Sequence, residues 1–268
     1  MEQPFEETQQ LSAEGVNKET AQLLLANQEL KAANQKLLSS NQHLENFASI
    51  VSHDLQAPLR SLTMFAELLA QEYKSELDED AHKYIEHITS SGFRMQTLVQ
   101  DLLAYSRAGK SQQTWISLDL KTLLSKVTED LQAAITETRA IIIIKDLPVV
   151  WVNPTEISQL FQNLIENALK FRSEQPPRIE ITATQQQEKW LVSISDNGIG
   201  IESEFQEQIF QVFQRLHASE AYSGTGIGLA ICQKIVQRYE GIIWVESELG
   251  KGSTFYFTLP INFAPQGD

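Results

Sequence analysis

The apolar residues near the start of the chain recur every seven positions. One heptad position is occupied by Leu23, Leu30, Leu37, Leu44 and Val51, and four residues after the first three leucines stand Asn27, Asn34 and Asn41. With the leucines at position d, the asparagines occupy position a, where polar residues sacrifice stability for register and a two-stranded state. We therefore predict a short parallel dimeric coiled coil over 19–45, with a lone solvated amphipathic helix as the alternative. Residues 1–18 show no clear period and form a poorly defined N-terminus in this interpretation.

Two longer helical patterns follow the repeats. The first runs to about Tyr73, and the second extends from about Glu79 to Ser106 after the polar turn KSELDED. The apolar stripe of the second consists of Tyr84, Ile88, Met95, Leu98, Leu102 and Tyr105. Two long helices joined by a short turn predict an antiparallel hairpin. Because one hairpin buries little core, we expect residues 42–108 of two copies to form a four-helix bundle.

Beyond a linker at 109–116, the pattern changes to alternating strands and helices. The expected strands are Ile141 to Lys145, Val149 to Val152, Ile179 to Thr184, Trp190 to Ser195, Ile242 to Ser247 and Thr254 to Leu259. The expected helices cover about 118–138, 155–172 and 226–239. This order predicts an α/β sandwich over 117–262, in which helices cover one sheet and the loops carry a site. The fold class of the whole chain is then α+β.

Composition narrows the classes of function. The chain has 268 residues and a formal net charge of -14, which argues against bulk binding to nucleic acid or to an anionic membrane. Its one cysteine, Cys232, permits no internal disulfide bond. The acidic start and the short apolar runs indicate neither a signal peptide nor a membrane-spanning helix. We therefore expect a cytoplasmic protein without membrane insertion.

His53 is the candidate for chemistry on the first helix. Continuing the heptad from Val51 places His53 at position f, which faces solvent, and Asp54 follows it directly. A neutral imidazole is a good nucleophile, and a neighbouring carboxylate can orient it or take its proton. Pro58 lies in the same helix and removes one backbone hydrogen bond beside the histidine. Taken alone, such a pair is more often ordinary surface.

Two segments of 117–262 carry residues that suit a nucleotide. On the helix at 155–172, Asn163, Asn167 and Lys170 share a face beside the buried stripe, where amide oxygens suit Mg²⁺ and a lysine suits phosphate. The alternative is a solvated polar face. The run DNGIG begins with Asp196 at a strand end, where a carboxylate can accept a hydrogen bond from an adenine amino group. Its glycines allow close backbone approach, although an ordinary turn has the same composition.

A third segment is rich in glycine. Residues 224–229, GTGIGL, open an apolar helix whose first N–H groups can face an anion. The stretch 201–223 before it contains Phe210, Phe213 and Arg215 and is long enough to form a mobile lid. A glycine-rich loop by itself is a weak signal.

Taken together, five segments resemble the sequence boxes of the two-component sensor histidine kinases. SHDLQAPL is similar to their H box, QNLIENALKF to the N box, DNGIG to the G1 box, IFQVFQRL to the F box and GTGIGLAI to the G2 box. The segments occur in the family's order, and the resemblance covers about residues 42–262. It implies a homodimer with a GHKL-type ATP-binding domain. It also implies phosphorylation of His53 by ATP, followed by transfer to an aspartate in the receiver domain of a response regulator.

The resemblance also implies roles for single residues. His53 is similar to the phosphoacceptor, with Asp54 as its acid–base helper, and Asp196 is similar to the carboxylate that reads adenine. The remaining roles concern the phosphates and the metal: Asn167 as Mg²⁺ ligand with Asn163 beside it, Lys170 on phosphate and Arg215 near the γ-phosphate. The other candidates for nucleotide binding are Gly198, Gly200, Phe213, Gly224, Thr225, Gly226, Gly228 and Leu229.

Two other functions compete with the kinase. One is a catalytically weak, nucleotide-binding dimeric adaptor, and the other is an ATPase of the wider superfamily. Those ATPases place a glutamate at the position of Asn163 to activate water, and an amide cannot act as that base. The chain departs from many bifunctional kinases at Ala57, where they carry Thr or Asn to help a water remove phosphate from the partner. We therefore expect weak phosphatase activity.

The coil generates a testable prediction about signal input. Its heptad register continues from Leu44 to Val51, next to His53, so we expect a separate sensor protein to act through the coil. Each residue inserted near Ser39 rotates the following helix by about 100°. Insertions of one to six residues should make autophosphorylation vary periodically, with recovery near seven. A smooth decline with insertion length would show that the coil only dimerises the chain.

Overall fold

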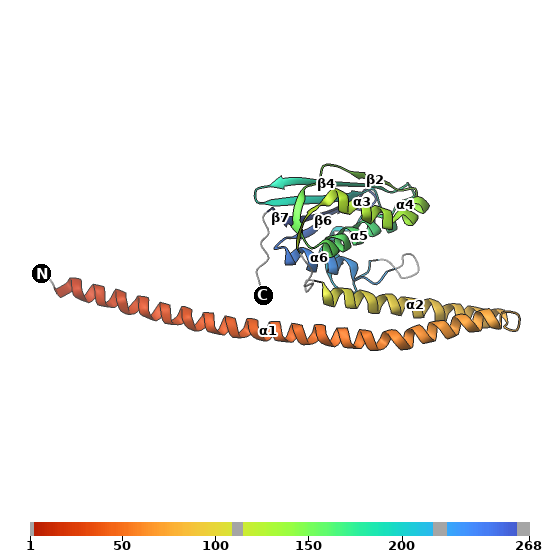
Figure 1. Cartoon of the computed structure of the whole chain (residues 1–268). Helices are drawn as coiled ribbons and strands as arrows, with labels where there is room; N and C mark the ends of the chain where they lie inside the picture. The colour runs from red at the N-terminus through yellow and green to blue at the C-terminus, as the bar shows by residue number, and fades with distance from the viewer. Residues whose placement is uncertain (1–2, 109–114, 217–223, 262–268) are drawn as a thin grey trace. The chain divides into compact units, whose positions relative to one another are not determined.

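The computed structural model in Figure 1 describes the backbone of residues 3–108, 115–216 and 224–261. Side chains are described over these ranges except at 3–23, 37, 38, 40–49 and 53. The chain divides into two units, Met1–Val51 and Ser52–Asp268. In the described ranges, no helix is both long enough and apolar enough to cross a membrane.

The first unit is helical throughout its described backbone. It belongs to helix α1 (Gln3–Glu72), which also includes residues 3–18, where the sequence has no clear period. The heptad residue Leu30 is 71% exposed in the single chain, and Asn27 and Asn34 are exposed as well. The side chains of Leu23, Leu37, Asn41 and Leu44 lie outside the described residues. Pairing of the coil therefore remains a prediction.

The second unit begins with the predicted hairpin, which the structure confirms. After a turn, α1 is followed by α2 (Glu79–Arg107), whose N-cap Asp78 accepts a hydrogen bond from the N–H of Ala81 at 2.8 Å. The two helices approach closely at Gly92, because a Cβ atom there would lie 2.5 Å from Oγ1 of Thr63. Gln96 donates a hydrogen bond to the same oxygen at 3.0 Å. This contact fixes the register of the two helices.

The hairpin also buries a hydroxyl without a hydrogen-bond partner. Ser52 is fully buried, and within the described residues no group hydrogen-bonds its Oγ. Helix α1 continues without interruption through Pro58, six residues further on. The segment of α1 around His53 is therefore less fully hydrogen-bonded than an ordinary helix.

A five-stranded sheet forms the centre of the remaining part. Its strand order is β2 (Ile141–Ile144), β4 (Arg178–Gln186), β5 (Lys189–Asp196), β7 (Gly252–Pro260) and β6 (Ile243–Glu248). Strands β2 and β4 run parallel, and the other neighbours run antiparallel. A separate two-stranded sheet pairs β1 (Ile116–Asp119) with β3 (Val149–Val152). The helices α3 (Leu120–Asp130), α4 (Gln132–Thr138), α5 (Pro154–Lys170) and α6 (Gly228–Arg238) lie on one side of the larger sheet.

The core lies between this sheet and the helices. On β5, Val192 and Ile194 are buried, and Trp190 on the same face packs against the core, as the two-residue period of a strand requires. Phe161 of α5 meets Phe257 of β7 edge-on, with ring centroids 5.6 Å apart. The predicted sandwich and the α+β class are confirmed.

Two details of the sequence interpretation were wrong. Strand β1 begins at Ile116, inside the segment assigned to the linker at 109–116, because four residues are too few to display a clear alternation. The single helix predicted at 118–138 is two helices, which break at Leu131, where the backbone turns to φ -92° and ψ 6°. The six predicted strands all exist, and their ends agree with the structure to within two residues.

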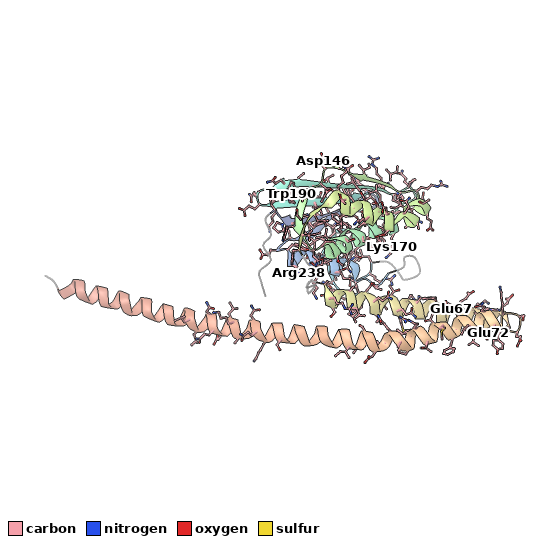
Figure 2. All side chains as sticks on the ribbon, viewed as in Figure 1. Glu67, Glu72, Asp146, Lys170, Trp190 and Arg238 are labelled. Carbon is pink, nitrogen blue, oxygen red and sulfur yellow. The ribbon has the colours of Figure 1, made fainter. Side chains whose placement is uncertain are left out.

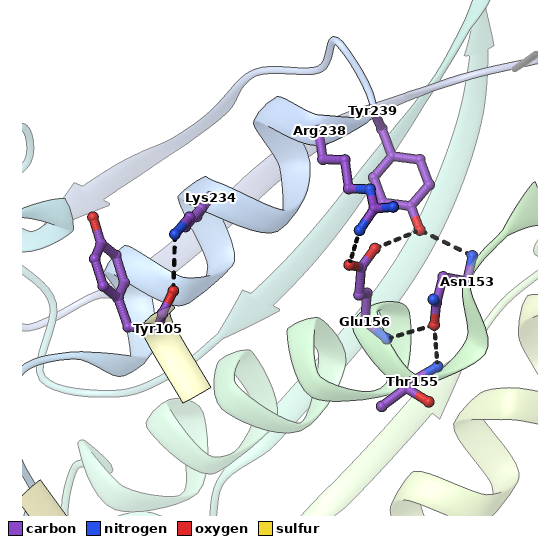
Figure 3. A network of polar contacts seen from close by, with 7 residues as sticks. All are labelled: Tyr105, Asn153, Thr155, Glu156, Lys234, Arg238 and Tyr239. Carbon is purple, nitrogen blue, oxygen red and sulfur yellow. Dashed lines mark hydrogen bonds and ion pairs between the residues drawn. The ribbon is translucent and has the colours of Figure 1, made fainter. Parts of the chain in front are cut away.

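A buried polar network joins α5 to α6 (Figure 3). Glu156, in the first turn of α5, is almost fully buried and accepts from Nη1 of Arg238 at 2.7 Å and from the hydroxyl of Tyr239 at 3.2 Å. That hydroxyl accepts from the N–H of Asn153, and Asn153 caps α5 through Oδ1. Arg238 also lies over the ring of Trp115. Burial raises the pKa of Tyr239 well above its usual range, so its hydroxyl remains a donor.

We predict that Arg238→Met destabilises the fold. The change leaves the carboxylate of Glu156 buried without its cation, which should lower the free energy of unfolding by about 3 kcal/mol. Urea unfolding of the full chain measures this. The double variant Glu156→Gln, Arg238→Met should lose much less stability than the single one, and equal losses would contradict the argument.

Candidate functional site

A cavity of about 1100 Å³ lies beside the C-terminal half of α5. Three segments that are distant in the sequence contribute to its wall: α5, the loop after β5, and the glycine-rich loop with the start of α6. Eleven of the predicted site residues line the cavity: Asn163, Asn167, Lys170, Asp196, Gly200, Arg215, Gly224, Thr225, Gly226, Gly228 and Leu229. Gly198 and Phe213 are not part of the lining, and the side chain of Phe213 is 57% exposed.

Asp196 provides a half-buried carboxylate in the cavity wall. Its Oδ1 accepts hydrogen bonds from the N–H groups of Gly198 at 2.8 Å and Ser253 at 3.3 Å. Burial raises the pKa of Asp196, and these two N–H groups offset part of the shift. Oδ2 receives no hydrogen bond from the described residues, so it can accept one from a ligand.

Gly198 holds this carboxylate although it lies outside the cavity wall. A Cβ atom at this position would lie 2.3 Å from the carbonyl oxygen of Phe171 and 2.8 Å from Oδ1 of Asp196. Only glycine therefore permits the hydrogen bond from its N–H. Gly198 thus acts on the site by positioning Asp196.

Two cations mark another part of the cavity wall. Lys170 is half-buried, and its pKa is lowered, mainly by desolvation and to a smaller extent by the charge of Arg215. The charge of Glu166 raises this pKa in part. A Cβ atom at Gly224 would lie 2.6 Å from Nζ of Lys170, so the ammonium group lies directly against the glycine-rich loop. Two neighbouring cations favour an anionic ligand, since an anion between them relieves their repulsion.

The two asparagines of α5 have different surroundings. Nδ2 of Asn163 donates to the carbonyl oxygen of Gly228 at 3.2 Å, which links α5 to the first residue of α6. Within the described residues, no group hydrogen-bonds the side chain of Asn167, so its amide is available to a ligand. The described residues also include no cluster of three His, Cys, Asp or Glu that could hold a metal ion. A metal at Asn167 would therefore need further oxygen ligands from a bound molecule or from water.

The glycine-rich loop is held in place from two sides. The N–H of Phe213 donates to the carbonyl oxygen of Gly226 at 3.0 Å. The hydroxyl of Thr225 donates to Oδ2 of Asp101, on α2, and accepts from the N–H of Ile227 at 3.4 Å. Asp101 lines the cavity as well. Sequence reasoning missed Asp101 and Ser253, because neither belongs to a recognisable motif.

The predicted phosphoacceptor belongs to α1. The backbone of His53 is helical, but its side chain lies outside the described residues, and Asp54 beside it is exposed. Residues 217–223 of the predicted lid also lie outside the described residues, and Phe210, earlier in that stretch, is buried. The acid–base pair and the mobile lid therefore remain predictions.

Two family models match the chain. Residues 43–111 match the His Kinase A (phospho-acceptor) domain, and residues 152–262 match the histidine kinase-, DNA gyrase B-, and HSP90-like ATPase. The first match includes the hairpin with His53, and the second includes the cavity residues of α5, β5 and α6.

Curated relatives match most of this chain, but the chain is only part of their length. Cyanobacterial phytochrome A of Nostoc sp. (strain PCC 7120) is 46% identical over 218 residues, which are 81% of this chain and 28% of the relative. Phytochrome-like protein Cph1 of Synechocystis sp. (strain PCC 6803) is 39% identical over 96% of this chain and 35% of its own. Adaptive-response sensory kinase SasA of Synechococcus sp. (strain JA-3-3Ab) is 36% identical over 80% of this chain and 58% of its own.

Solved structures share the fold. Full-length ShkA in complex with AMPPNP aligns with a TM-score of 0.63 at 25% identity, over 82% of this chain and 47% of ShkA. Histidine kinase ThkA in complex with response regulator protein TrrA aligns with a TM-score of 0.55 at 24% identity, over 83% of this chain and 64% of that one.

We predict that Asp196→Asn weakens the binding of adenosine nucleotides. Loss of a charged hydrogen bond should reduce the affinity roughly ten- to a hundred-fold, as measured by calorimetry. Because burial raises the pKa of Asp196, its carboxylate protonates at a higher pH than an exposed aspartate. On acidification, wild-type affinity should therefore fall at a higher pH than that at which an exposed aspartate protonates, whereas the variant should lack this fall. Unchanged affinity of the variant at neutral pH would refute the role.

Proposed function

The chain belongs to the two-component sensor histidine kinases, and from this premise we propose that it is an ATP-dependent protein-histidine kinase. In this proposal the γ-phosphoryl group of ATP moves to His53 and then to an aspartate of a response regulator. The observation that carries the proposal is the cavity. It places a half-buried carboxylate, Asp196, and two cations, Lys170 and Arg215, in one wall together with the glycine-rich loop.

Each group has a part in binding ATP. Oδ2 of Asp196 accepts a hydrogen bond from the amino group of adenine, and Lys170 and Arg215 neutralise the phosphates. The amide of Asn167, which no described residue engages, fits Mg²⁺, with the missing ligands supplied by phosphate oxygens and water. When bound there, Mg²⁺ supplies charge neutralisation on the phosphates. Phosphoryl transfer needs mainly such positioning and neutralisation.

His53 receives the phosphoryl group as a neutral imidazole. Its position beside Asp54 lets the carboxylate orient the ring or take its proton. Both residues lie in α1, between Ser52, whose hydroxyl has no partner among the described residues, and Pro58, which removes one backbone hydrogen bond. The proposal includes that His53 comes close enough to a nucleotide in the cavity to receive its γ-phosphoryl group.

The contact of Asn163 favours a kinase over an ATPase. An amide cannot take a proton from water, and the Asn163 amide is already engaged with the carbonyl oxygen of Gly228. A bound ATP would thus be hydrolysed slowly and remain available to His53. The weak adaptor is the second candidate and would also bind nucleotide, but it offers no role for the nucleophile His53 beside Asp54.

Exposed apolar side chains on the hairpin support dimerisation, which is part of the proposal. Large apolar side chains of α1 and α2 are exposed in the single chain: Leu62, Met64, Phe65, Leu69, Tyr84, Ile88, Phe93 and Met95. These residues would be covered when two hairpins form a four-helix bundle. The partners in this proposal are a second copy, a response regulator and a sensor protein acting through the coil, and the setting is the cytoplasm.

We predict that His53→Gln abolishes autophosphorylation and leaves nucleotide binding intact. Glutamine keeps a similar size but is no nucleophile, so radiolabelled ATP should leave no acid-labile, alkali-stable label on the chain. The matched control is His87→Gln, because His87 is exposed on α2 outside the cavity wall. The control should label like the wild type. Full labelling of the His53 variant would overturn the assignment.

A further inference from the structure

Asp101 connects α2 to the nucleotide cavity. Its Oδ2 accepts the hydrogen bond from the hydroxyl of Thr225 in the glycine-rich loop. One helical turn later on the same face of α2, the backbone oxygen of Tyr105 accepts from Nζ of Lys234 at 3.0 Å, and that ammonium lies 4.7 Å from the centre of the Tyr105 ring (Figure 3). Leu102 and Tyr105 pack against the core. The end of α2 therefore holds α6 at one point and the loop that precedes it at another.

The hydroxyl of Thr225 has only one hydrogen to donate. In this structure that hydrogen goes to Asp101, while a lone pair of the same oxygen accepts from Ile227. Thr225 can exchange its acceptor for a phosphate oxygen and keep the bond from Ile227, but it cannot donate to both acceptors together. A hydrogen bond from this hydroxyl to Asp101 and one from it to a phosphate are therefore mutually exclusive.

The charge of Asp101 also opposes the binding of phosphate in the cavity. The ammonium of Lys170 lies against Gly224, the residue before Thr225, so Asp101 places an anionic oxygen on the loop next to a cation expected to bind phosphate. Asp101 also forms part of the cavity wall. A carboxylate and a triphosphate in one cavity repel each other.

We propose that Asp101 is an internal competitor of the nucleotide phosphates. While α2 holds Thr225 through this carboxylate, ATP binds more weakly, and bound ATP releases Thr225 from α2. The inference rests on the proposed function, since it concerns the same cavity. Because coupling between two binding events is reciprocal, the nucleotide weakens the hold of α2 on the glycine-rich loop by the same factor.

Calorimetry on the full chain tests the competition. Asp101→Asn removes the charge and leaves a neutral acceptor, so affinity for AMPPNP with Mg²⁺ should rise roughly tenfold. Affinity for adenosine, which has no phosphate, should not change. The matched control is Glu86→Gln, which removes the same charge from an exposed position of α2 outside the cavity wall. That control should bind AMPPNP like the wild type.

A double-mutant cycle tests the route through Thr225. In a Thr225→Val background, which has no hydroxyl to donate, Asp101→Asn should change AMPPNP affinity far less than in the wild type. Hydrogen exchange of the unaltered chain provides a measurement that does not depend on any variant. AMPPNP, but not adenosine, should speed exchange of the backbone amides at 102–107.

Three results would overturn the inference. The first is an AMPPNP affinity that stays the same or falls in Asp101→Asn. The second is an equal gain for AMPPNP and adenosine, which would mean a general loosening of α2. The third is unchanged exchange at 102–107 when AMPPNP binds. If the wild type bound no nucleotide at all, the proposed function itself would fail, and the inference would fail with it.

Discussion

Burial of one face of α5 against the sheet is the constraint on which the site depends. Ile157, Leu160, Phe161, Leu164, Ile165 and Ala168 are in the core, with almost no exposed surface. Once these residues are buried, the 3.6-residue period leaves Asn163, Asn167 and Lys170 on the adjoining face, toward the cavity. The same hydrophobic packing that stabilises the domain therefore also positions its polar groups, among them Lys170 (Figure 2).

Helix α6 makes a different structural contact at its start, in its middle and at its end. Its first residue, Gly228, accepts from Asn163 and lines the cavity, and Lys234 in its middle holds the end of α2. Its last residue, Arg238, pairs with the buried Glu156 at the far end of α5. Because all three contacts belong to one helix of eleven residues, we expect a displacement at one of them to shift the other two.

Much of this architecture could be predicted from local patterns, because strands and helices with one buried face have clear periods. The cavity-lining residues of α5, Asp196 and the glycine-rich loop could be proposed from the sequence because each stands in a segment that resembles a sequence box of the family. Asp101 could not be found in this way, since its role comes from a contact with Thr225 across 124 positions of sequence. Ser253 contributes only its N–H, which every residue other than proline has. The break between α3 and α4 at Leu131 could not be predicted either, because leucine is a good helix former.

The buried hydroxyl of Ser52 has a consequence for local stability. A hydroxyl removed from water without a partner carries a desolvation cost of about 1–3 kcal/mol, and Pro58 cannot donate to the carbonyl oxygen of Asp54. The turn of α1 after residue 53 therefore lacks one backbone hydrogen bond, whereas the Thr63–Gln96 contact further along the hairpin adds a hydrogen bond between the two helices. Local unfolding begins where such bonds are fewest. We therefore expect the turns of α1 around Pro58 to fray before the region of the Thr63–Gln96 contact, so that one or two turns can open while the rest of the hairpin stays folded.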